Sequence, residues 1–439
     1  MKPVGGAPES GRRTQKWRGG RRLAKRGVPG LGLRAALTTA AEMKKSSLRF
    51  PFVLLIVVAA ALSCRSVARR GLTIGPVIDV DASRLPIEAE SLNGTLYLLS
   101  AAEPGAVELR KDVEDLLGGS LDSADAAGGR FRHISIWRRG VKPGDRSAGV
   151  MARLRFPAMP EHPEHGRVFP EFRRLLGDWY HDRRAFRPEV LSELVRRIKR
   201  PVDQHHGYPD TGRPYATCAV VGNSGILLKS EHGDLIDGHD LVIRLNNARV
   251  EGYQRHVGAK TTLSFINSNV LHSCAMRVGC HCHPYGDDVP IVVYICQPAH
   301  FLEYMVCNAT HKSPLLVTDG AFDTLCARIV KYYSLKTFVE GTGKHPTVWG
   351  KFHDEKMFHY SSGMQAIVLA LGICERVSVF GFGKSAEAKH HYHTNQVAEL
   401  DLHDYAAEYE FYGDLVERPQ AIPFLRDAGI KIPPVVFYH

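Results

Sequence analysis

The fold can be worked out from the stretch Cys218-Ala219-Val220-Val221-Gly222-Asn223-Ser224-Gly225, which opens the region 218–262. Its first four residues form a short apolar run, typical of a buried parallel strand. The glycines that follow break the strand and would let backbone amides approach an anion or a nucleotide closely. A second apolar strand is expected at 241–245, with Asn246 at its C-terminal end. Ligands bind at that end of the strands in open α/β sheets.

Apolar strands and helices alternate through the following 200 or so residues of the chain, which favours an α/β fold with a largely parallel sheet. Strands are predicted at 218–221, 241–245, 262–266, 291–296, 315–318 and 376–380. Helices are predicted at 188–200, 322–333 and 363–373.

A second polar cluster, His359-Tyr360-Ser361-Ser362-Gly363, directly precedes a helix that is apolar on all sides. Such a helix is expected to be buried. Ser361 and Ser362 would lie at its N-terminus, where a hydroxyl can cap the helix. Unpaired amides and the helix dipole can also receive a phosphate there. The two roles are compatible, and both remain open.

The positive charge is concentrated near the N-terminus. The formal net charge is +11, but residues 1–70 hold sixteen Lys and Arg against two acids, whereas the rest holds 41 basic and 44 acidic residues. We therefore expect no cationic nucleic-acid surface on the folded part and no nucleic-acid partner. Residues 1–49 are predicted to be a basic, disordered cytoplasmic tail. Met43 is a second plausible start, so residues 1–42 are either an organelle-targeting leader or not part of the native protein.

An apolar segment follows the basic tail. Residues 50–64 would span roughly 22 Å as a helix, which suits the thinner membranes of the early secretory pathway. The segment is either a cleaved signal peptide or an uncleaved transmembrane signal-anchor over 50–68. Basic residues on its N-terminal side favour the anchor. In that case residues 69–105 are a lumenal stem and residues 106–439 form a single lumenal catalytic domain.

Eight of the nine cysteines follow the apolar segment, as in proteins of disulfide-forming compartments. Cys280 and Cys282 are flanked by histidines, but their spacing is too tight for a usual zinc knuckle, so no metal site is expected. Two sequons predict N-glycosylation at Asn93 and Asn308.

Four stretches together resemble the sialyl motifs of the sialyltransferase family, glycosyltransferase family 29. The region 218–262 resembles the long motif, 345–383 the short motif, 390–394 the third motif and 403–408 the very short His-x4-Glu motif. The plant sialyltransferase-like proteins are the members that the chain resembles most. The resemblance implies a Rossmann-like variant of the A-type glycosyltransferase fold and residence in the Golgi apparatus membrane as a single-pass type II protein. It also implies inverting transfer from a CMP-sugar without a metal or other cofactor.

The resemblance further implies roles for individual residues. The CMP-sugar donor is expected to contact Asn223, Asn246, Ser361, Ser362 and Gly363. His403 is the expected general base and His391 the expected contact of the donor phosphate, with Glu408 and His390 as supporting residues. Cys218 and Cys374 are the matching pair of cysteines that are bonded in the family.

Three positions depart from the family pattern and leave donor and acceptor open. His256 stands where Asp is common, and His393-Thr394 where an aromatic residue and an acid are usual. One interpretation is transfer of sialic acid or a related acid to a glycan hydroxyl, such as the terminal galactose of a glycoprotein. A second is transfer of Kdo or galactose onto cell-wall polysaccharide or arabinogalactan. A third is an inactive, glycan-binding remnant, which the intact motif residues argue against.

Overall fold

The computed structural model describes residues 89–103, 105–118, 165–275, 284–353, 358–383, 385, 387–394 and 403–439. These residues all belong to one unit, which begins at Asp79. The expected tail at 1–49, the expected anchor at 50–68 and the first part of the expected stem lie outside them, as do Cys280 and Cys282. Within the described ranges, no helix is both long and apolar enough to cross a membrane.

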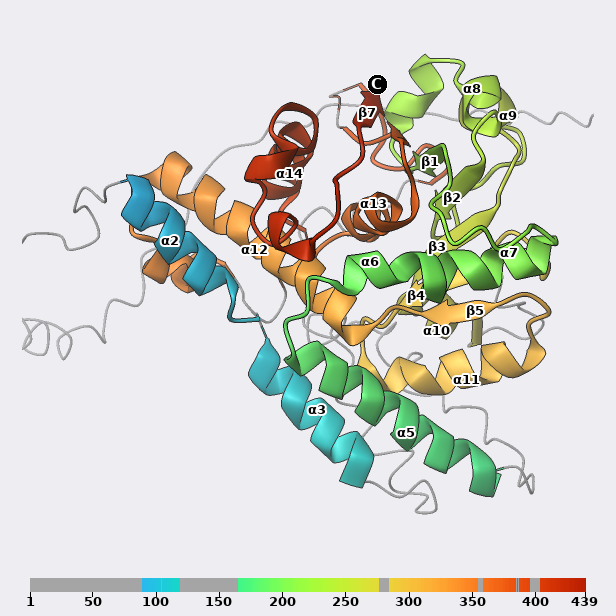
Figure 1. The fold of residues 1–439 in the computed structure, drawn as a ribbon, viewed down its shortest axis with the longest axis horizontal. Coiled ribbons are helices and arrows are strands. Elements are labelled where there is room, and N and C mark those ends of the chain that lie inside the picture. Colours follow the sequence, from blue (N-terminus) through green and yellow to red (C-terminus); the bar gives the residue numbers. More distant parts are fainter. Residues whose placement is uncertain are drawn as a thin grey trace, which may run out of the picture. The chain divides into compact units, whose positions relative to one another are not determined.

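A parallel sheet of seven short strands forms the centre of the unit (Figure 1). The order across the sheet is β5-β4-β3-β2-β1-β6-β7, and each neighbouring pair runs parallel. The strands are β1 (Cys218–Val221), β2 (Leu241–Leu245), β3 (Leu263–Asn267), β4 (Ile291–Tyr294), β5 (Leu315–Val317), β6 (Val377–Phe380) and β7 (Val435–Tyr438). The first six lie within two residues of the predicted strands, so the predicted α/β class is confirmed.

The strand β7 was not among the predicted strands. It forms an edge of the sheet and pairs with β6, with Val435 opposite Val377. Pro433 and Pro434 directly precede it, and proline cannot donate to a strand ladder. A run of four residues after two prolines therefore gives little strand signal in the sequence.

The strand order reverses at β1. From β1 the chain proceeds outward through β2, β3, β4 and β5, and it then returns to β6 on the other side of β1. In open parallel sheets, ligands bind outside the carboxyl ends of the strands at such a reversal. The loop that begins at Gly222 follows β1, and the loop that begins at Gly381 follows β6.

Helices cover both faces of the sheet. The principal ones are α2 (Ala89–Ser100), α3 (Ala106–Gly118), α5 (His165–Arg184), α6 (Val190–Leu194), α7 (Arg200–His206), α8 (Gly233–Asp237), α9 (Gln254–Val257), α10 (Ser268–Ala275), α11 (Phe301–Thr310), α12 (Gly320–Thr342), α13 (Ser362–Ile373) and α14 (Tyr405–Glu417). Alternate residues of β1 belong to different hydrophobic clusters: Val220 lies in the larger one and Val221 in a smaller one. The strands are therefore buried on both faces, which explains their uninterrupted apolar sequences.

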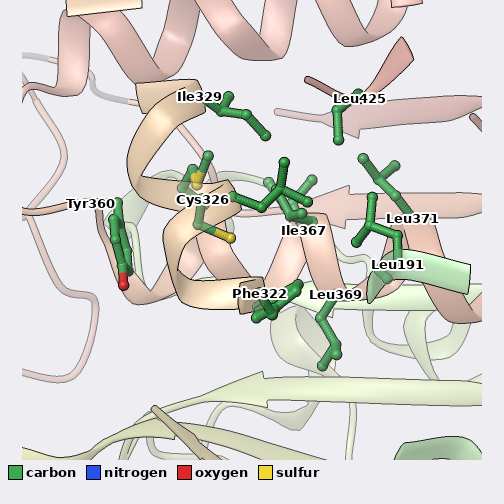
Figure 2. Packing of buried hydrophobic residues seen from close by; sticks show 14 of the residues in the cluster. Leu191, Phe322, Cys326, Ile329, Tyr360, Ile367, Leu369, Leu371 and Leu425 are labelled. Carbon is green, nitrogen blue, oxygen red and sulfur yellow. The ribbon is translucent and has the colours of Figure 1, made fainter. Parts of the chain in front are cut away.

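The larger cluster is centred on α13, the helix that was predicted to be buried. Phe322 and Cys326 of α12 lie beside Ile367 and Leu369 of α13 in the close-up of this core (Figure 2). The residues of α13 from Ser362 to Leu371 are all buried. The helix α12 is longer than predicted at both ends, and Asp319 caps its N-terminus by accepting a hydrogen bond from the amide of Ala321.

Two segments depart from the expected organisation. Residues 89–100 fall in the expected stem, but they form α2, which packs against α12. Leu96 of α2 is 1% exposed and belongs to the larger cluster, so the packed structure begins before the expected boundary at 105/106. The helix predicted at 188–200 continues to His206, through α6, a π-helical turn at Val195–Lys199 and α7.

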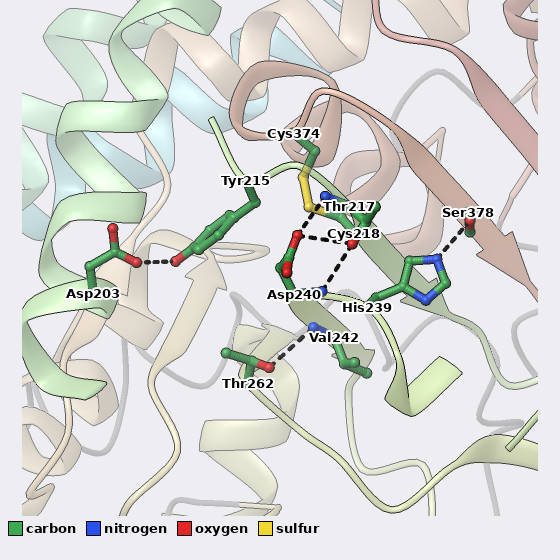
Figure 3. Close-up of a disulfide and its surroundings, with 10 residues drawn as sticks. All are labelled: Asp203, Tyr215, Thr217, Cys218, His239, Asp240, Val242, Thr262, Cys374 and Ser378. Atoms are coloured by element: carbon green, nitrogen blue, oxygen red, sulfur yellow. Dashed lines mark hydrogen bonds between the residues drawn. A yellow bond between two sulfur atoms is a disulfide. The ribbon is translucent and has the colours of Figure 1, made fainter. Parts of the chain in front are cut away.

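A disulfide joins Cys218 at the start of β1 to Cys374 at the end of α13, as expected (Figure 3). The two Cα atoms are 6.1 Å apart and 156 positions separate the residues. Cys307 is also disulfide-bonded, whereas Cys296 and Cys326 are free thiols. The even number of downstream cysteines therefore does not mean that all of them are paired.

Candidate active site

The N-terminus of α13 is held by a buried carboxylate. Ser361 caps the helix, since its Oγ accepts a hydrogen bond from the amide of Met364 (3.1 Å). Glu408 of α14 is 1% exposed and accepts hydrogen bonds from the Ser361 amide (2.7 Å) and the Ser361 hydroxyl (2.6 Å). The hydroxyl of Tyr412 donates to the same carboxylate (3.0 Å). Burial raises the pKa of Glu408.

Glu408 and Met364 already use the hydroxyl and the amide of Ser361 in hydrogen bonds within the protein. The first amides of a helix have no partner within the helix. The amides of Ser362 and Gly363 are therefore the groups at this end of α13 that can meet a phosphate. Gly363 has a further reason to be glycine: a Cβ there would lie 2.6 Å from the ring of Phe382.

Asn246 joins the carboxyl ends of two strands to α13. Its φ of +49° is unusual for a residue other than glycine but is tolerated by asparagine. Its Oδ1 accepts hydrogen bonds from the amide (3.0 Å) and side chain (3.1 Å) of Asn267, and its Nδ2 donates to the Oγ of Ser362 (3.3 Å). Asn267 is a site residue that the sequence analysis missed. It ends an apolar strand just as Asn246 follows one, and that pattern was the available signal.

The glycines of the first loop are needed by the protein's own backbone. A Cβ on Gly222 would lie 2.7 Å from the carbonyl oxygen of Gly381, and one on Gly225 would lie 2.6 Å from that of Lys389. The fold itself therefore requires glycine at both positions, and a close approach of this loop to a nucleotide stays a prediction. The Asn223 carbonyl accepts a hydrogen bond from the Tyr392 amide (2.9 Å), which fixes the 387–394 loop beside β1.

The hydrogen bond between Asn223 and Tyr392 brings Asn223 to the loop that carries His391. Asn223 is half-buried, and its side-chain oxygen has no hydrogen-bond partner. A buried polar atom without a partner is uncommon, and a ligand can supply the missing bond. The rings of His390 and His391 stack at 4.5 Å, and His393 lies 5.8 Å from His391. Burial and these two neighbours lower the pKa of His391 to about 4, so it is neutral at pH 7.

His403 is oriented by the backbone just before α13. Its Nδ1 lies 3.0 Å from the carbonyl oxygen of His359, and the two residues also pair as an isolated parallel bridge. A carbonyl only accepts hydrogen bonds, so Nδ1 carries a proton, and in the neutral imidazole the lone pair is on Nε2. The ring of Tyr405 contacts His403 at 5.6 Å and His390 at 5.9 Å. His403 therefore has the tautomer that a general base requires.

The other predicted residues lie away from these contacts. Asn93 is exposed on α2 and Asn308 is exposed on α11, so both sequon asparagines lie on helices. His256 lies in α9, where its Nδ1 hydrogen-bonds the carbonyl of Ser230 (2.7 Å). Among the described side chains, no group of three or more His, Cys, Asp and Glu could hold a metal ion.

This sheet, with amides and imidazoles gathered at its carboxyl edge, has the architecture of an α/β enzyme whose ligand site lies at the ends of the strands. More specifically, the chain belongs to glycosyltransferase family 29 (sialyltransferase), whose family model matches residues 171–419. It is a glycosyltransferase, and the sequence-based assignment to this family is confirmed.

Two plant relatives are similar over nearly their whole length, and the matches to mammalian sialyltransferases cover a smaller part of this chain. Sialyltransferase-like protein 1 of Oryza sativa is 50% identical, over 90% of this chain and 100% of that protein. A beta-1,6-galactosyltransferase of Arabidopsis thaliana is 46% identical, over 89% of this chain and 98% of that protein. A CMP-N-acetylneuraminate-beta-galactosamide-alpha-2,3-sialyltransferase 1 of Sus scrofa is 30% identical, over 40% of this chain and 47% of that protein. A crystal structure of a mammalian sialyltransferase matches 60% of this chain and 84% of that chain, at 22% identity and a TM-score of 0.34.

Proposed function

We propose that this glycosyltransferase transfers a sugar, with inversion, from a nucleotide sugar to a glycan hydroxyl, with His403 as the general base. The observation that carries the proposal is the hydrogen bond from His403 Nδ1 to the carbonyl of His359, which leaves Nε2 able to accept a proton. The acceptor oxygen bonds to the anomeric carbon as the bond from that carbon to the donor phosphate breaks. The hydroxyl proton passes to His403 Nε2, and the nucleotide leaves with the electron pair.

The leaving phosphate would meet the α13 terminus and His391. The amides of Ser362 and Gly363 point out of the first turn of α13, and Asn246 holds the side chain of Ser362 in place. His391 is neutral before binding, and an adjacent phosphate would raise its pKa and favour the protonated form. These groups could stabilise a single phosphate without a metal, which suits a CMP-linked sugar.

Two transfer reactions are candidates. The first is a CMP-linked acidic sugar, sialic acid or a related acid, transferred to a terminal galactose of a glycoprotein. The second is galactose or Kdo transferred onto a cell-wall polysaccharide or arabinogalactan. The similarity to a beta-1,6-galactosyltransferase over 89% of this chain favours galactose in this second case. The assembled contacts of Asn246, His403 and Glu408 argue against an inactive remnant.

The experiment is a donor panel with the purified protein. CMP-sialic acid, CMP-Kdo and UDP-galactose are each supplied with a β-galactoside acceptor, with and without EDTA, and the released nucleotide and the product are measured. We expect acceptor-dependent release from one of the donors, and resistance to EDTA if that donor carries CMP. Absence of acceptor-dependent release from every donor would support the inactive remnant instead.

We further propose that the 50–68 segment anchors the protein in the Golgi membrane, with the catalytic domain in the lumen. The apolar sequence of residues 50–64 and the disulfide between Cys218 and Cys374 support this placement, because disulfides persist in secretory compartments.

A further inference from the structure

A second group of ionisable side chains lies at the carboxyl edge of the sheet, beyond the residues assigned to the donor. His272 of α10 pairs with Glu303 of α11, with 2.8 Å between Nδ1 and Oε1. The ring of His272 stacks on that of His300, with centroids 4.8 Å apart and planes 16° apart. His300 in turn hydrogen-bonds through Nδ1 to the Oγ of Ser268 (2.8 Å).

This His272 cluster, made of His272, His300, Glu303 and Ser268, has unused hydrogen-bonding capacity. Glu303 is 4% exposed, and its Oε2 is buried without a hydrogen-bond partner. The side chain of His272, by contrast, is 41% exposed. Exposed ion pairs contribute little to stability, and burying a carboxylate is costly. Stability alone therefore does not account for a buried carboxylate behind an accessible imidazole.

The pKa values of the two stacked rings are shifted in opposite directions. The hydrogen bond to Glu303 raises the pKa of His272, whereas burial lowers the pKa of His300 to about 4. Glu303 accepts the Nδ1 proton of His272, so Nε2 is the ring nitrogen left to meet a ligand. In either protonation state Nε2 can bond a hydroxyl group, because a hydroxyl both donates and accepts hydrogen bonds. This suits a polyhydroxylated ligand such as a sugar.

The His272 cluster is directly connected to the donor residues. Asn267, which bonds Asn246 and Ser362, immediately precedes Ser268 in the chain. The Oγ of Ser268 also accepts a hydrogen bond from the amide of Cys296, just after β4 (2.9 Å). The cluster therefore lies at the ends of β3 and β4, next to the Asn267 end of the donor site.

We propose that His272, backed by Glu303 and His300, binds a hydroxyl of the acceptor sugar and so helps to select the acceptor. The inference rests on the proposed sugar transfer and names the part of the site that holds the second substrate. Nε2 of His272 makes the contact with the sugar hydroxyl. Glu303 and His300 act through His272, by fixing the direction of its ring.

Two substitutions separate ligand binding from a structural role. His272→Asn places its amide where Nδ1 lies, so it can keep the bond to Glu303. It has no group at the position of Nε2. His272→Gln reaches the position of Nε2 and can still contact a sugar. We expect the acceptor KM to rise about 10-fold or more for His272→Asn and by about 3-fold for His272→Gln, since one hydrogen bond is worth about a factor of ten. The donor KM and kcat should change less than about 3-fold. His181→Ala, at an exposed histidine of α5, is the control and should match the wild type.

Three kinetic outcomes would contradict the proposal. An unchanged acceptor KM in His272→Asn, or a smaller defect in His272→Asn than in His272→Gln, would indicate a structural role. A rise in the donor KM would place the residue on the nucleotide side. Binding of a β-galactoside disaccharide to the wild type and both variants, followed by saturation-transfer NMR without donor, tests the subsite separately. If the wild type shows no transfer from any donor but His272→Asn still weakens this binding, the transfer reaction fails while the subsite stands.

Discussion

At the scale of single residues, one histidine is assigned to the chemical step and another to binding of the donor. His403 is assigned to the acceptor proton because a backbone carbonyl fixes its tautomer, whereas His391 is assigned to the leaving phosphate beside Asn223. Neither role could be derived from the sequence alone, because an imidazole becomes a base or an anion contact only through its neighbours. The family motifs indicated the two positions, and the structure supplies the hydrogen bond to His359 that explains one of them.

His403→Ala should lower turnover by roughly 10²–10⁴-fold, the usual contribution of a general base, and leave nucleotide affinity nearly unchanged. His391→Ala should weaken nucleotide affinity as well as turnover, because its proposed ligand is the phosphate. Calorimetric titration with CMP or UDP, beside transfer rates, distinguishes the two variants. Loss of nucleotide binding in a folded His403→Ala protein, or full activity in that variant, would show that the base has been assigned wrongly.

At the scale of elements, Glu408 couples α14 to the phosphate end of α13. Its carboxylate receives the Ser361 amide, the Ser361 hydroxyl and the Tyr412 hydroxyl. The sequence alone showed only a histidine and a glutamate five positions apart, and the family resemblance implied a supporting role for Glu408. In the structure, Glu408 bonds Ser361, whereas His403 bonds the carbonyl of His359. No local pattern could have revealed the contact of Glu408 with Ser361, because 47 positions separate them.

Glu408→Gln replaces one acceptor oxygen by a donor that faces two hydroxyl groups. We expect the free energy of unfolding to fall by about 1–3 kcal/mol, the usual cost of leaving a buried polar group unsatisfied. Nucleotide affinity should fall as well, because Glu408 would hold Ser361 less firmly, and Ser361 positions the neighbouring amides of Ser362 and Gly363. Urea unfolding and calorimetry measure the two effects. Glu417→Gln, at an exposed position at the end of α14, should change stability by less than about 0.5 kcal/mol. Equal effects of the two substitutions would contradict this role of Glu408.

The disulfide couples β1 to the other end of α13. Cys218→Ala with Cys374→Ala should lower the free energy of unfolding by about 5 kcal/mol at most, because the bond closes a loop across 156 positions. Urea unfolding of the double variant tests this expectation. Cys326→Ala, at a buried free thiol, controls for the loss of a buried sulfur atom and should cost less. A loss in the double variant no larger than in this control would mean that the bond contributes little.

Elements whose burial is complete could be predicted from their apolar runs. Strands such as β1 and β2 read as uninterrupted apolar runs, and α13 reads as an apolar helix, because both faces of the sheet are covered. The helix α2 was missed because only a few of its residues, Leu96 among them, face α12, and its other side is exposed. Half-buried elements at the margin of the core depend on tertiary contacts that the local sequence does not specify.

At the scale of the whole molecule, the proposed orientation across the Golgi membrane can be tested directly. Protease treatment of sealed Golgi vesicles should leave the catalytic domain intact until detergent is added, because the domain would lie in the lumen. The basic residues before the apolar segment support this orientation. Digestion of the domain in sealed vesicles would exclude it, and recovery of a soluble protein that begins after residue 64 would favour the cleaved signal peptide.

The pH dependence of stability is a second property of the whole molecule. Burial lowers the pKa of His300, His359 and His391 to about 4, from an ordinary value near 6.5. Between pH 6.5 and 4 the unfolded chain therefore binds more protons at these residues than the native protein does. Their contribution to stability is complete above pH 6.5 and is lost as the pH falls. Burial raises the pKa of Asp323 to about 6, which acts in the opposite direction and offsets part of the loss.

We therefore expect the free energy of unfolding to be smaller at pH 5 than at pH 7. His300 is 4% exposed, and its share of the drop should be about 2 kcal/mol. His300→Asn can keep the bond to Ser268 but does not titrate, so it should be less stable than the wild type at pH 7 and lose less on acidification. Urea unfolding of both proteins at the two pH values measures the difference. If the two proteins lost equal stability between pH 7 and pH 5, His300 would not be held neutral by the fold, and the acid sensitivity would have to come from His359 and His391.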